Sequence, residues 1–347
     1  MRAHSSYSSW SSHFLPLLLL LLTSGVLSDD HRVVVYYQTT NAHGSYGDHV
    51  SLLPLVYDRR DISVTHVLLA AIHLNDSDGV HLNDFPPWDP LFDDVWTDVA
   101  ILQSRGVIVT GMLGGAATGS FQRLDGDEDK FERYYGPLHD MIATYNLQGL
   151  DLDVEESMSL DGVIRLIDRL HSDFGDDFVI TLSPVASALQ EGGGNLSGFN
   201  YFELEERRGD SISFYNAQFY SGFASATSTS DYEDIVDSGF PSEKVVMGLL
   251  TNSANGYGFV ELNTTGSVIR ELAAEYDDFG GVAGWEYFNS LPGNITDPAE
   301  WADWAADQMD VDFVLDTSSV KFRAKRTAHD VWHVVRRWGR KTWRLLS

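Results

Sequence analysis

The sequence predicts an α/β fold, a (β/α)8 or TIM barrel that forms a single domain. Eight apolar, strand-like segments recur along the chain, and segments with helical periodicity lie between them. With 347 residues, of which 43% are hydrophobic, the chain is long enough for the roughly 250 residues that such a barrel uses. A doubly wound open sheet is the alternative, because it is also a parallel α/β layout.

The expected strands are runs of apolar residues bounded by polar or glycine-containing turns. In chain order they cover residues 32–38, 65–74, 107–113, 147–155, 178–185, 211–220, 244–250 and 280–288. Helical periodicity is clearest over residues 91–105, 129–145 and 160–174. In the last of these segments one face is apolar and predicts packing on the sheet, through Val163, Ile164, Ile167 and Leu170. No repeat or low-complexity linker divides residues 29–310, which we therefore interpret as one domain.

Charge is distributed unevenly along the chain. The last 27 residues contain nine basic residues and a single acid, Asp330, whereas the first 320 contain 14 basic and 50 acidic residues, a net charge of −36. So acidic a body repels nucleic acid and anionic membranes and suits a soluble protein that acts on a neutral substrate. There are no cysteines, which excludes disulfides, thiolate metal sites and a cysteine nucleophile.

The first 28 residues are expected to be a signal peptide. An apolar run from Phe14 to Leu22 is followed by the small residues Val26 and Ser28, and it is too short to span a bilayer. A short membrane anchor is the alternative. Four Asn-x-Ser/Thr sequons agree with secretion and predict N-glycosylation of an extracellular protein, at Asn75, Asn195, Asn263 and Asn294.

The basic tail, residues 311–347, has three possible interpretations. A loose apolar stripe opposite basic residues would suit a helix that contacts an anionic surface. The tail could instead be disordered, or be removed after the dibasic pair Lys325-Arg326. Disorder or removal is favoured, because Gly339 interrupts the apolar face.

The most informative segment is "LDLDVE", which alternates acidic and apolar residues within an expected strand. Asp151, Asp153 and Glu155 point the same way, with successive Cα atoms about 6.8 Å apart. In a barrel, such residues near the C-terminal end of a strand lie at the active-site mouth, while Leu150, Leu152 and Val154 face the helices. Crowding raises the pKa of one carboxyl, so that Glu155 can stay protonated and act as an acid.

The alternatives for these acids are a calcium loop and a solvated acidic edge. A calcium loop over residues 151–162 would need a glycine at its sixth position and a final glutamate, and this segment ends in Gly162. The glycine-rich "GMLGGAATGS" is no phosphate loop, because no lysine precedes its serine. We therefore expect neither a metal ion nor a cofactor.

The segment "LQGLDLDVE" resembles the Asp-Gly-x-Asp-x-Asp-x-Glu signature of glycoside hydrolase family 18. The resemblance covers roughly residues 33–308 and is closest to the fungal endo-β-N-acetylglucosaminidases of that family, through "YYQTT", "HLNDFPPWDPLF", "YNAQFYSGF" and "GGVAGWEYFNSLPG". One position departs from the signature: Gln148 stands where the family usually has its first aspartate. This departure implies that the remote part of the carboxylate relay is missing.

The resemblance implies retaining, substrate-assisted hydrolysis of a β-1,4 bond between N-acetylglucosamine (GlcNAc) units. Glu155 would protonate the leaving oxygen, and the substrate's own acetamido oxygen would attack to form an oxazolinium ion. Asp153 would hold the acetamido N–H and stabilise its developing positive charge. Asp151 would pair with Asp153 and tune both groups.

The resemblance also implies a tyrosine on the sixth strand that grips the acetamido oxygen. Asn216, Gln218 and Tyr220 share one parity and are expected to face inward, with Tyr220 as that residue and Gln218 beside it. Tyr215, on the other parity with Phe219, is the fallback.

Further substrate contacts are expected around the barrel mouth. Trp285, near the end of the last strand, would form an apolar floor under the sugar ring. Gly114 and Gly115 would let the third βα turn pass close to the sugar, or would simply form a tight turn. Tyr37, in "YYQTT", completes the expected substrate-binding residues.

The resulting hypothesis is a secreted, endo-acting glycosidase that releases N-glycans at their chitobiose core, with a carbohydrate as its partner. A chitinase with the same catalytic residues is the first alternative. A non-catalytic lectin on the same barrel is the second, although such proteins typically lack the acid that is present here as Glu155. We expect a monomer that binds no nucleic acid.

Overall fold

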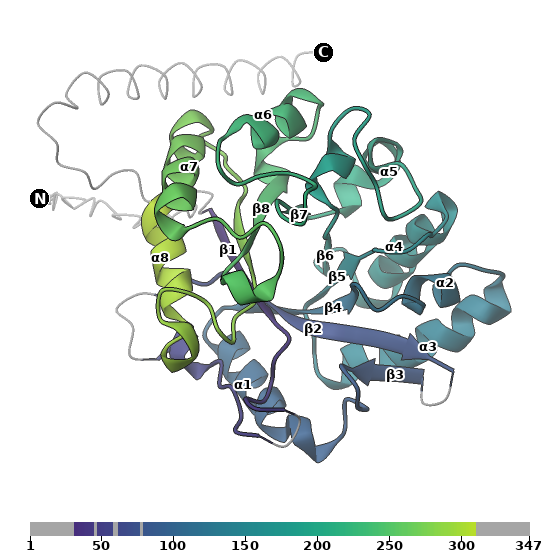
Figure 1. Cartoon of the computed structure of the whole chain (residues 1–347). Coiled ribbons are helices and arrows are strands. Elements are labelled where there is room, and N and C mark those ends of the chain that lie inside the picture. The colour runs from purple at the N-terminus through teal and green to yellow at the C-terminus, as the bar shows by residue number, and fades with distance from the viewer. Residues whose placement is uncertain (1–30, 45–46, 58–61, 77–78, 310–347) are drawn as a thin grey trace, which may run out of the picture. The chain divides into compact units, whose positions relative to one another are not determined.

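Eight parallel strands form a closed ring in the computed structural model, which describes residues 31–44, 47–57, 62–76 and 79–309 (Figure 1). Each strand is hydrogen-bonded to the next around the ring, and the β1–β2 pairing closes it. The strands are β1 (Arg32–Tyr37), β2 (His66–Asn75), β4 (Ile108–Gly114), β5 (Gly149–Asp153), β6 (Val179–Leu182), β7 (Phe214–Gln218), β8 (Val245–Leu250) and β9 (Gly281–Trp285). Closure excludes the open doubly wound sheet and confirms the predicted (β/α)8 barrel.

Helices surround the ring and follow the strands in the expected order. They are α1 (Asp93–Ser104), α2 (Ser120–Leu124), α3 (Glu128–Thr144), α4 (Leu160–Phe174), α5 (Tyr201–Arg208), α6 (Ser230–Asp237), α7 (Leu262–Glu275) and α8 (Glu300–Met309). The three predicted helical segments correspond to α1, α3 and α4. Helix α4 begins where expected because the Ser159 hydroxyl accepts a hydrogen bond from the Gly162 N–H at 3.0 Å.

One strand was not predicted. The four-residue β3 (Gly79–Leu82) pairs antiparallel with the outer part of β2, and Gly79 approaches Pro137 of α3 closely (Figure 1). The segment is too short to give a clear periodic signal. The predicted strand over 147–155 ends at Asp153, so Glu155 lies just beyond the strand at the barrel mouth.

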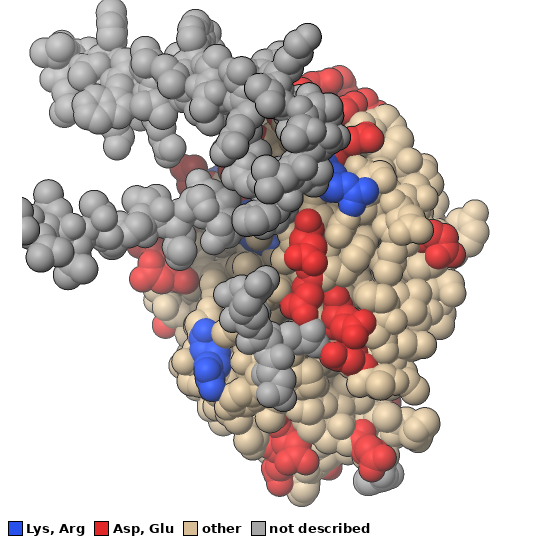
Figure 2. All heavy atoms as spheres, turned by 90° about the vertical axis from the view of Figure 1, so that its left-hand side faces the viewer, with Lys and Arg blue, Asp and Glu red and all other residues tan. Residues whose placement is uncertain are grey.

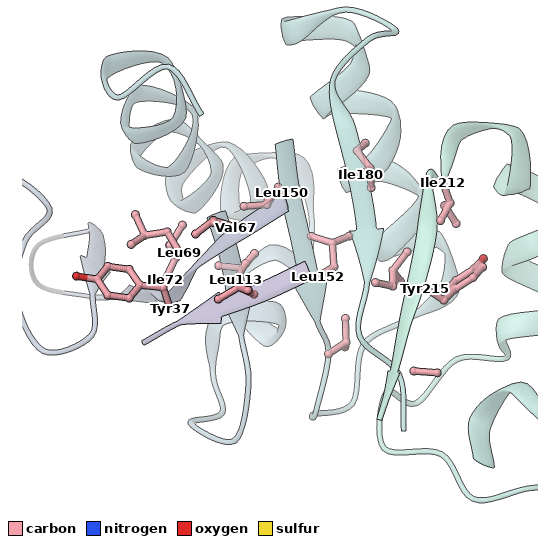
Figure 3. Close-up of a cluster of buried hydrophobic side chains, with 14 of the residues drawn as sticks. Tyr37, Val67, Leu69, Ile72, Leu113, Leu150, Leu152, Ile180, Ile212 and Tyr215 are labelled. Carbon is pink, nitrogen blue, oxygen red and sulfur yellow. The ribbon is translucent and has the colours of Figure 1, made fainter. Parts of the chain in front are cut away.

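The core has two parts, separated by the wall of the barrel. Leu150, Leu152 and Val154 belong to the larger cluster, between the strands and the helices, as the alternation on β5 predicts (Figure 3). A smaller cluster fills the inside of the ring, through Val34, Tyr36, Leu68, Ala70, Ala71, Met112, Phe214, Val246 and Ala283.

The acidic character predicted from the composition is visible on the folded surface. On the face in Figure 2, Asp and Glu are more numerous than Lys and Arg. Within the residues described above, no helix has the length and apolar character needed to cross a membrane. The predicted signal peptide over residues 1–28 and the basic tail over 311–347 lie outside the described residues.

The predicted glycosylation sites differ in their surroundings. Asn195, Asn263 and Asn294 are exposed, and Asn75 is half-buried at the end of β2. The side chain of Asn195 is already used by the fold, because its Nδ2 donates to the Phe199 carbonyl at 2.5 Å.

Candidate active site

Three carboxyl groups lie in a row at the C-terminal end of β5. Asp151 is completely buried inside the barrel, Asp153 is 6% exposed, and Glu155 is half-buried beyond the strand end. Residues two apart on a strand share a face, so the row rises from the barrel interior to its mouth. The structure thus brings together the three acids that the motif singled out.

Asp151, at the bottom of the row, is surrounded by hydrogen-bond donors. The hydroxyl groups of Thr181, on the neighbouring β6, and of Ser183, just beyond the end of β6, donate to its two oxygens at 2.5 and 2.6 Å. Asn216 Nδ2 and the Tyr36 hydroxyl add bonds of 3.1 and 3.3 Å. Burial raises the pKa of Asp151, and these donors offset part of that effect.

Asp153 is the acid of the row whose pKa responds most clearly to the charges of its neighbours. Burial, followed by the charges of Glu155 and Asp151, raises its pKa well above the usual range. From the sequence we expect crowding of the carboxyls to keep a proton on Glu155. In the structure the carboxyl whose pKa is raised, by burial and then by its neighbours' charges, is that of Asp153, which lies between the other two and is almost fully buried.

Gln218, the last residue of β7, links the upper two acids. Its Nε2 lies 3.1 Å from Asp153 Oδ1 and 3.1 Å from Glu155 Oε1, and 3.0 Å from the Ser183 carbonyl. Two N–H groups are therefore shared among three acceptors. A single nitrogen, Gln218 Nε2, thus contacts the carboxyl groups of both Asp153 and Glu155.

The inward parity predicted for the sixth strand agrees with the structure. Gln218, Asn216 and Tyr220 line a small cavity at the barrel centre. Burial, followed by the charges of Asp153, Glu155 and Asp151, raises the pKa of Tyr220 well above its usual range. Among the described residues, the buried Asn216 Oδ1 finds no hydrogen-bond partner, which leaves an acceptor available to a ligand.

The fallback residue Tyr215 lies on the other side of β7. It packs in the outer cluster, and its hydroxyl donates to Glu205 Oε2 at 2.6 Å (Figure 3). Phe219 also lies in the outer cluster, as expected. Tyr215 therefore does not reach the cavity.

Trp285, the last residue of β9, borders the same cavity. Its ring is half-buried and lies 5.5 Å from the ring of Tyr36, centroid to centroid, at an angle of 60°. The indole thus forms an apolar wall opposite the polar groups of β5 and β7.

The assignment of Tyr37 as a substrate contact is wrong. Tyr37 is fully buried in the outer cluster, and its hydroxyl donates to the Val50 carbonyl at 2.7 Å (Figure 3). Its neighbour Tyr36 has the opposite parity, faces the barrel interior and lines the cavity. Because every residue of β1 after Arg32 is buried, the sequence pattern could not show which tyrosine faces inward.

Gly114 and Gly115 form a tight turn against Asp153. Their φ angles are +97° and +87°, which favour glycine. A Cβ at Gly114 would lie 2.5 Å from the Asp153 carbonyl oxygen, and the Gly115 N–H donates to that oxygen at 2.9 Å. The glycines are therefore needed to let the turn approach the carboxylate row.

Gln148 lies at the other end of β5 and has a different role from the acids. Its Oε1 accepts a hydrogen bond from the Val109 N–H at 2.9 Å, on the neighbouring strand. Gln148 has the parity of Leu150 and Leu152, which face the helices, whereas Asp151 faces inward. The sequence implied that Gln148 leaves the remote part of the carboxylate relay missing. That expectation is wrong, because position 148 does not belong to the row of inward-facing acids on β5.

A wider, open cleft lies at the ends of β1 and β2. Most of its lining is polar, namely Gln38, Thr39, Thr40, Asn41, His73, Asn83 and Asp84, with Gly44, Phe85, Leu91, Phe92 and Ala117 completing it. Glu286, which follows Trp285, fixes one wall by accepting from the N–H groups of Gln38 and Thr39 at 3.1 and 2.8 Å. In the part of the chain described, no three His, Asp or Glu side chains are grouped to hold a metal ion.

Several residues of the site were missed by sequence reasoning. Thr181, on β6, and Ser183, just beyond its end, share a parity, which is the signal that could have identified them as inward groups. Glu156 and Glu286 bind backbone N–H groups of loops distant in the sequence, and no local pattern reveals such contacts.

Two solved structures are similar to this chain over most of its length. The chain is 48% identical to a fungal endo-β-N-acetylglucosaminidase of glycosyl hydrolase family 18, over 80% of this chain and 98% of that one, with a TM-score of 0.77. It is 52% identical to a chitinase from Aspergillus fumigatus, over 80% of this chain and 99% of that one, with a TM-score of 0.73.

Comparison with curated sequences gives more distant relatives. Chitinase 2 of Rhizopus oligosporus is 26% identical over 213 residues, which are 55% of this chain and 36% of that protein. The chain thus spans about a third of the length of this curated relative. No protein-family model matches the chain. The two solved relatives, which this chain covers almost entirely, nevertheless show that it belongs to glycoside hydrolase family 18.

Proposed function

We propose that the chain is an endo-acting hydrolase of β-1,4 bonds between GlcNAc units, and that it releases N-glycans at their chitobiose core. The observation that carries this proposal is the position of Asp153 and Glu155, which share the Gln218 amide, with Asp153 lining a small central cavity. One acid can act on the glycosidic oxygen while the other binds the acetamido group of the same sugar.

Glu155 donates a proton to the leaving oxygen, because it is the most exposed of the three acids and lies nearest the barrel mouth. Asp153 binds the acetamido N–H. Accepting that bond favours the ionised form of Asp153, whose pKa burial raises in the empty site. Glu155, which contacts the same Gln218 nitrogen, is then the carboxyl that carries the proton for the leaving oxygen.

The substrate's acetamido oxygen attacks the anomeric carbon as the leaving-group bond breaks, and an oxazolinium ion forms. Water then opens this ion, with Glu155 accepting the proton, so that the configuration is retained. The Tyr220 hydroxyl, whose raised pKa keeps it protonated, donates to the acetamido oxygen. Asp151 stabilises the positive charge that develops beside Asp153, and Trp285 stacks on the sugar ring.

The polar cleft beside β1 and β2 supports an N-glycan as the substrate. Its amide, hydroxyl and carboxylate groups suit the many hydroxyl groups of a mannose-containing branch. The second candidate is chitin, which the chitinase relative from Aspergillus fumigatus supports equally well. Both candidates use the same catalytic residues.

The deciding experiment is to incubate the protein with a high-mannose glycoprotein and, separately, with colloidal chitin, and to identify the released sugars by mass spectrometry. Free glycans ending in a single GlcNAc support the N-glycan proposal, and chitin oligomers support the alternative. Binding without release would indicate the lectin. A thiazoline that mimics the oxazolinium ion should inhibit competitively, and rapid hydrolysis of a substrate without the 2-acetamido group would contradict the mechanism.

We also propose that the protein is secreted as an extracellular monomer. The apolar run of residues 14–22 and the four sequons support this proposal. Intact-mass measurement and N-terminal sequencing of the protein secreted by its native host would test it. A mature chain that begins near Asp29 is expected, and a mass below that of the remaining sequence would reveal removal of the basic tail.

A further inference from the structure

We propose that Glu156, the residue after the acid Glu155, is a positioning residue that holds Glu155 in place through the loop that follows β4. This inference rests on the function proposed above. Glu156 is only 7% exposed. Its Oε2 accepts a hydrogen bond from the Gly119 N–H at 2.7 Å, and its Oε1 accepts one from the Phe121 N–H at 2.8 Å. Each carboxylate oxygen thus accepts one backbone hydrogen bond.

The loop that Glu156 binds is the same loop that binds Asp153. The Gly115 N–H, at the start of the loop, donates to the Asp153 carbonyl at 2.9 Å. Residues 115–121 therefore bind the segment 153–156 at both of its ends. Glu155 lies between the two attachment points, so the position of its backbone depends on both.

A side-chain contact couples the two attachment points. The ring of Phe121 lies against Gly114, where a Cβ would come within 2.4 Å of Phe121 Cε2 and 2.5 Å of the Asp153 carbonyl oxygen. The hydrogen bond from Phe121 to Glu156 thus fixes a ring that packs on the turn beside Asp153. Closely packed contacts of this kind transmit small displacements, since no empty space absorbs them.

A purely structural role would be the simpler explanation, because the backbone N–H groups that Glu156 binds lie at the N-terminal end of the short helix α2. The two roles differ in their kinetic consequence. Loss of a stabilising contact lowers the melting temperature and leaves the turnover of the folded protein unchanged. Displacement of a general acid lowers kcat, and a misplacement of about 1 Å can cost about 10²-fold.

The test is the Glu156→Gln variant of the full chain. Glutamine offers one acceptor, while its amide N–H2 faces the second backbone donor, so one of the two bonds is lost. We expect kcat to fall about 10-fold or more, with KM within about 2-fold of the wild-type value. The readouts are kcat, KM and the melting temperature, on the substrate that the wild-type chain cleaves.

The matched control is Glu205→Gln, at the opposite end of the barrel. Glu205 accepts bonds of 2.6 Å from both Lys244 and Tyr215, which lie at the N-terminal ends of β8 and β7. This variant should lower the melting temperature and keep the wild-type kcat. Equal kcat values for the two variants, with both melting temperatures lowered, would show that Glu156 acts only through stability and would overturn the proposal.

Two further measurements keep the test decisive. If Glu156→Gln does not fold, the Glu156→Asp variant takes its place, because the shorter side chain cannot reach both backbone donors. A lowered kcat of this variant supports the proposal, and an unchanged kcat overturns it. If the wild-type chain cleaves neither a glycoprotein nor chitin, the proposed function fails on its own account. Hydrogen exchange then tests the attachment: faster exchange at Gly119 and Phe121 in Glu156→Gln supports it, and unchanged exchange overturns it.

Discussion

The Nε2 of Gln218 lies 3.1 Å from the Oδ1 of Asp153 and is the hydrogen-bond donor that faces it from β7. Because the same nitrogen also lies 3.1 Å from Glu155, this amide sets the relative positions of both acids. A residue of β7, which only β6 separates from the motif strand β5, therefore determines how the motif works.

Replacement of Gln218 by glutamate should lower kcat/KM by about 10²-fold, the usual cost of removing a donor aimed at the reacting centre. The substitution keeps the size of the side chain but turns a shared donor into an acceptor, next to two carboxyls that already repel each other. Steady-state kinetics test this expectation, with circular dichroism as the check on folding. Activity close to that of the wild type would contradict the bridging role.

Replacement of Glu155 by glutamine should lower kcat by about 10²–10⁴-fold, because the amide cannot protonate the leaving oxygen. The melting temperature should change little, since the half-buried side chain keeps its shape and its neighbours. Single-turnover rates with either candidate substrate test this prediction. Wild-type turnover in the Glu155→Gln variant would show that another group is the acid.

Replacement of Asp153 by asparagine should make the folded protein more stable at pH 7. Burial, followed by the charges of Glu155 and Asp151, raises the pKa of Asp153 in the folded state. For an acid with a raised folded pKa, the stability it contributes is fully present below the unfolded pKa of about 3.9 and is lost as the pH rises through the folded pKa. The variant avoids that loss, so its melting temperature should exceed the wild-type value at pH 7, and the difference should shrink toward pH 4.

Asp98 provides a control, because its pKa is shifted in the opposite direction from that of Asp153. Burial raises its pKa, but hydrogen bonds from His49, Leu52 and Ser51 outweigh burial, and the pKa is lowered. Its contribution to stability is present above the unfolded pKa and is lost as the pH falls through the folded pKa. Asp98→Asn should therefore lower the melting temperature at pH 7, with a smaller effect near pH 4. The same sign of change for both variants would contradict the assigned shifts.

The sequence predicted the parts of the site that follow from alternation along a single strand. On β5 the acids and leucines alternate, and on β7 the two amides Asn216 and Gln218 share one parity, so their faces could be assigned before the structure. On β1 the run "VVVYY" is apolar throughout and carries no such contrast, and Tyr37 was chosen where Tyr36 faces inward.

Contacts between distant loops were beyond the reach of the sequence pattern. The partners of Glu156 are backbone N–H groups, and any residue except proline supplies one. The glycines at 114 and 115 were noticed as a turn, but the contact of that turn with Asp153 appears only in the folded chain. Likewise, the role expected of Gln148 depended on its motif position, whereas its parity on β5 directs it to the helix side.

Tyr220 and Tyr215 provide a test of the sixth strand of the barrel, because Tyr215 lies on the outer face of β7 and Tyr220, two residues beyond its end, lines the central cavity. Tyr220→Phe removes only the hydroxyl at the central cavity and should lower kcat by about 10²-fold, while the melting temperature stays near that of the wild type. Tyr215→Phe removes the 2.6 Å hydrogen bond to Glu205 and should cost about 1–3 kcal/mol of unfolding free energy, with kcat unchanged. Kinetics and chemical denaturation of both variants decide the assignment. The reverse pattern, with activity lost only in Tyr215→Phe, would mean that the inward parity of Tyr220 has no catalytic consequence.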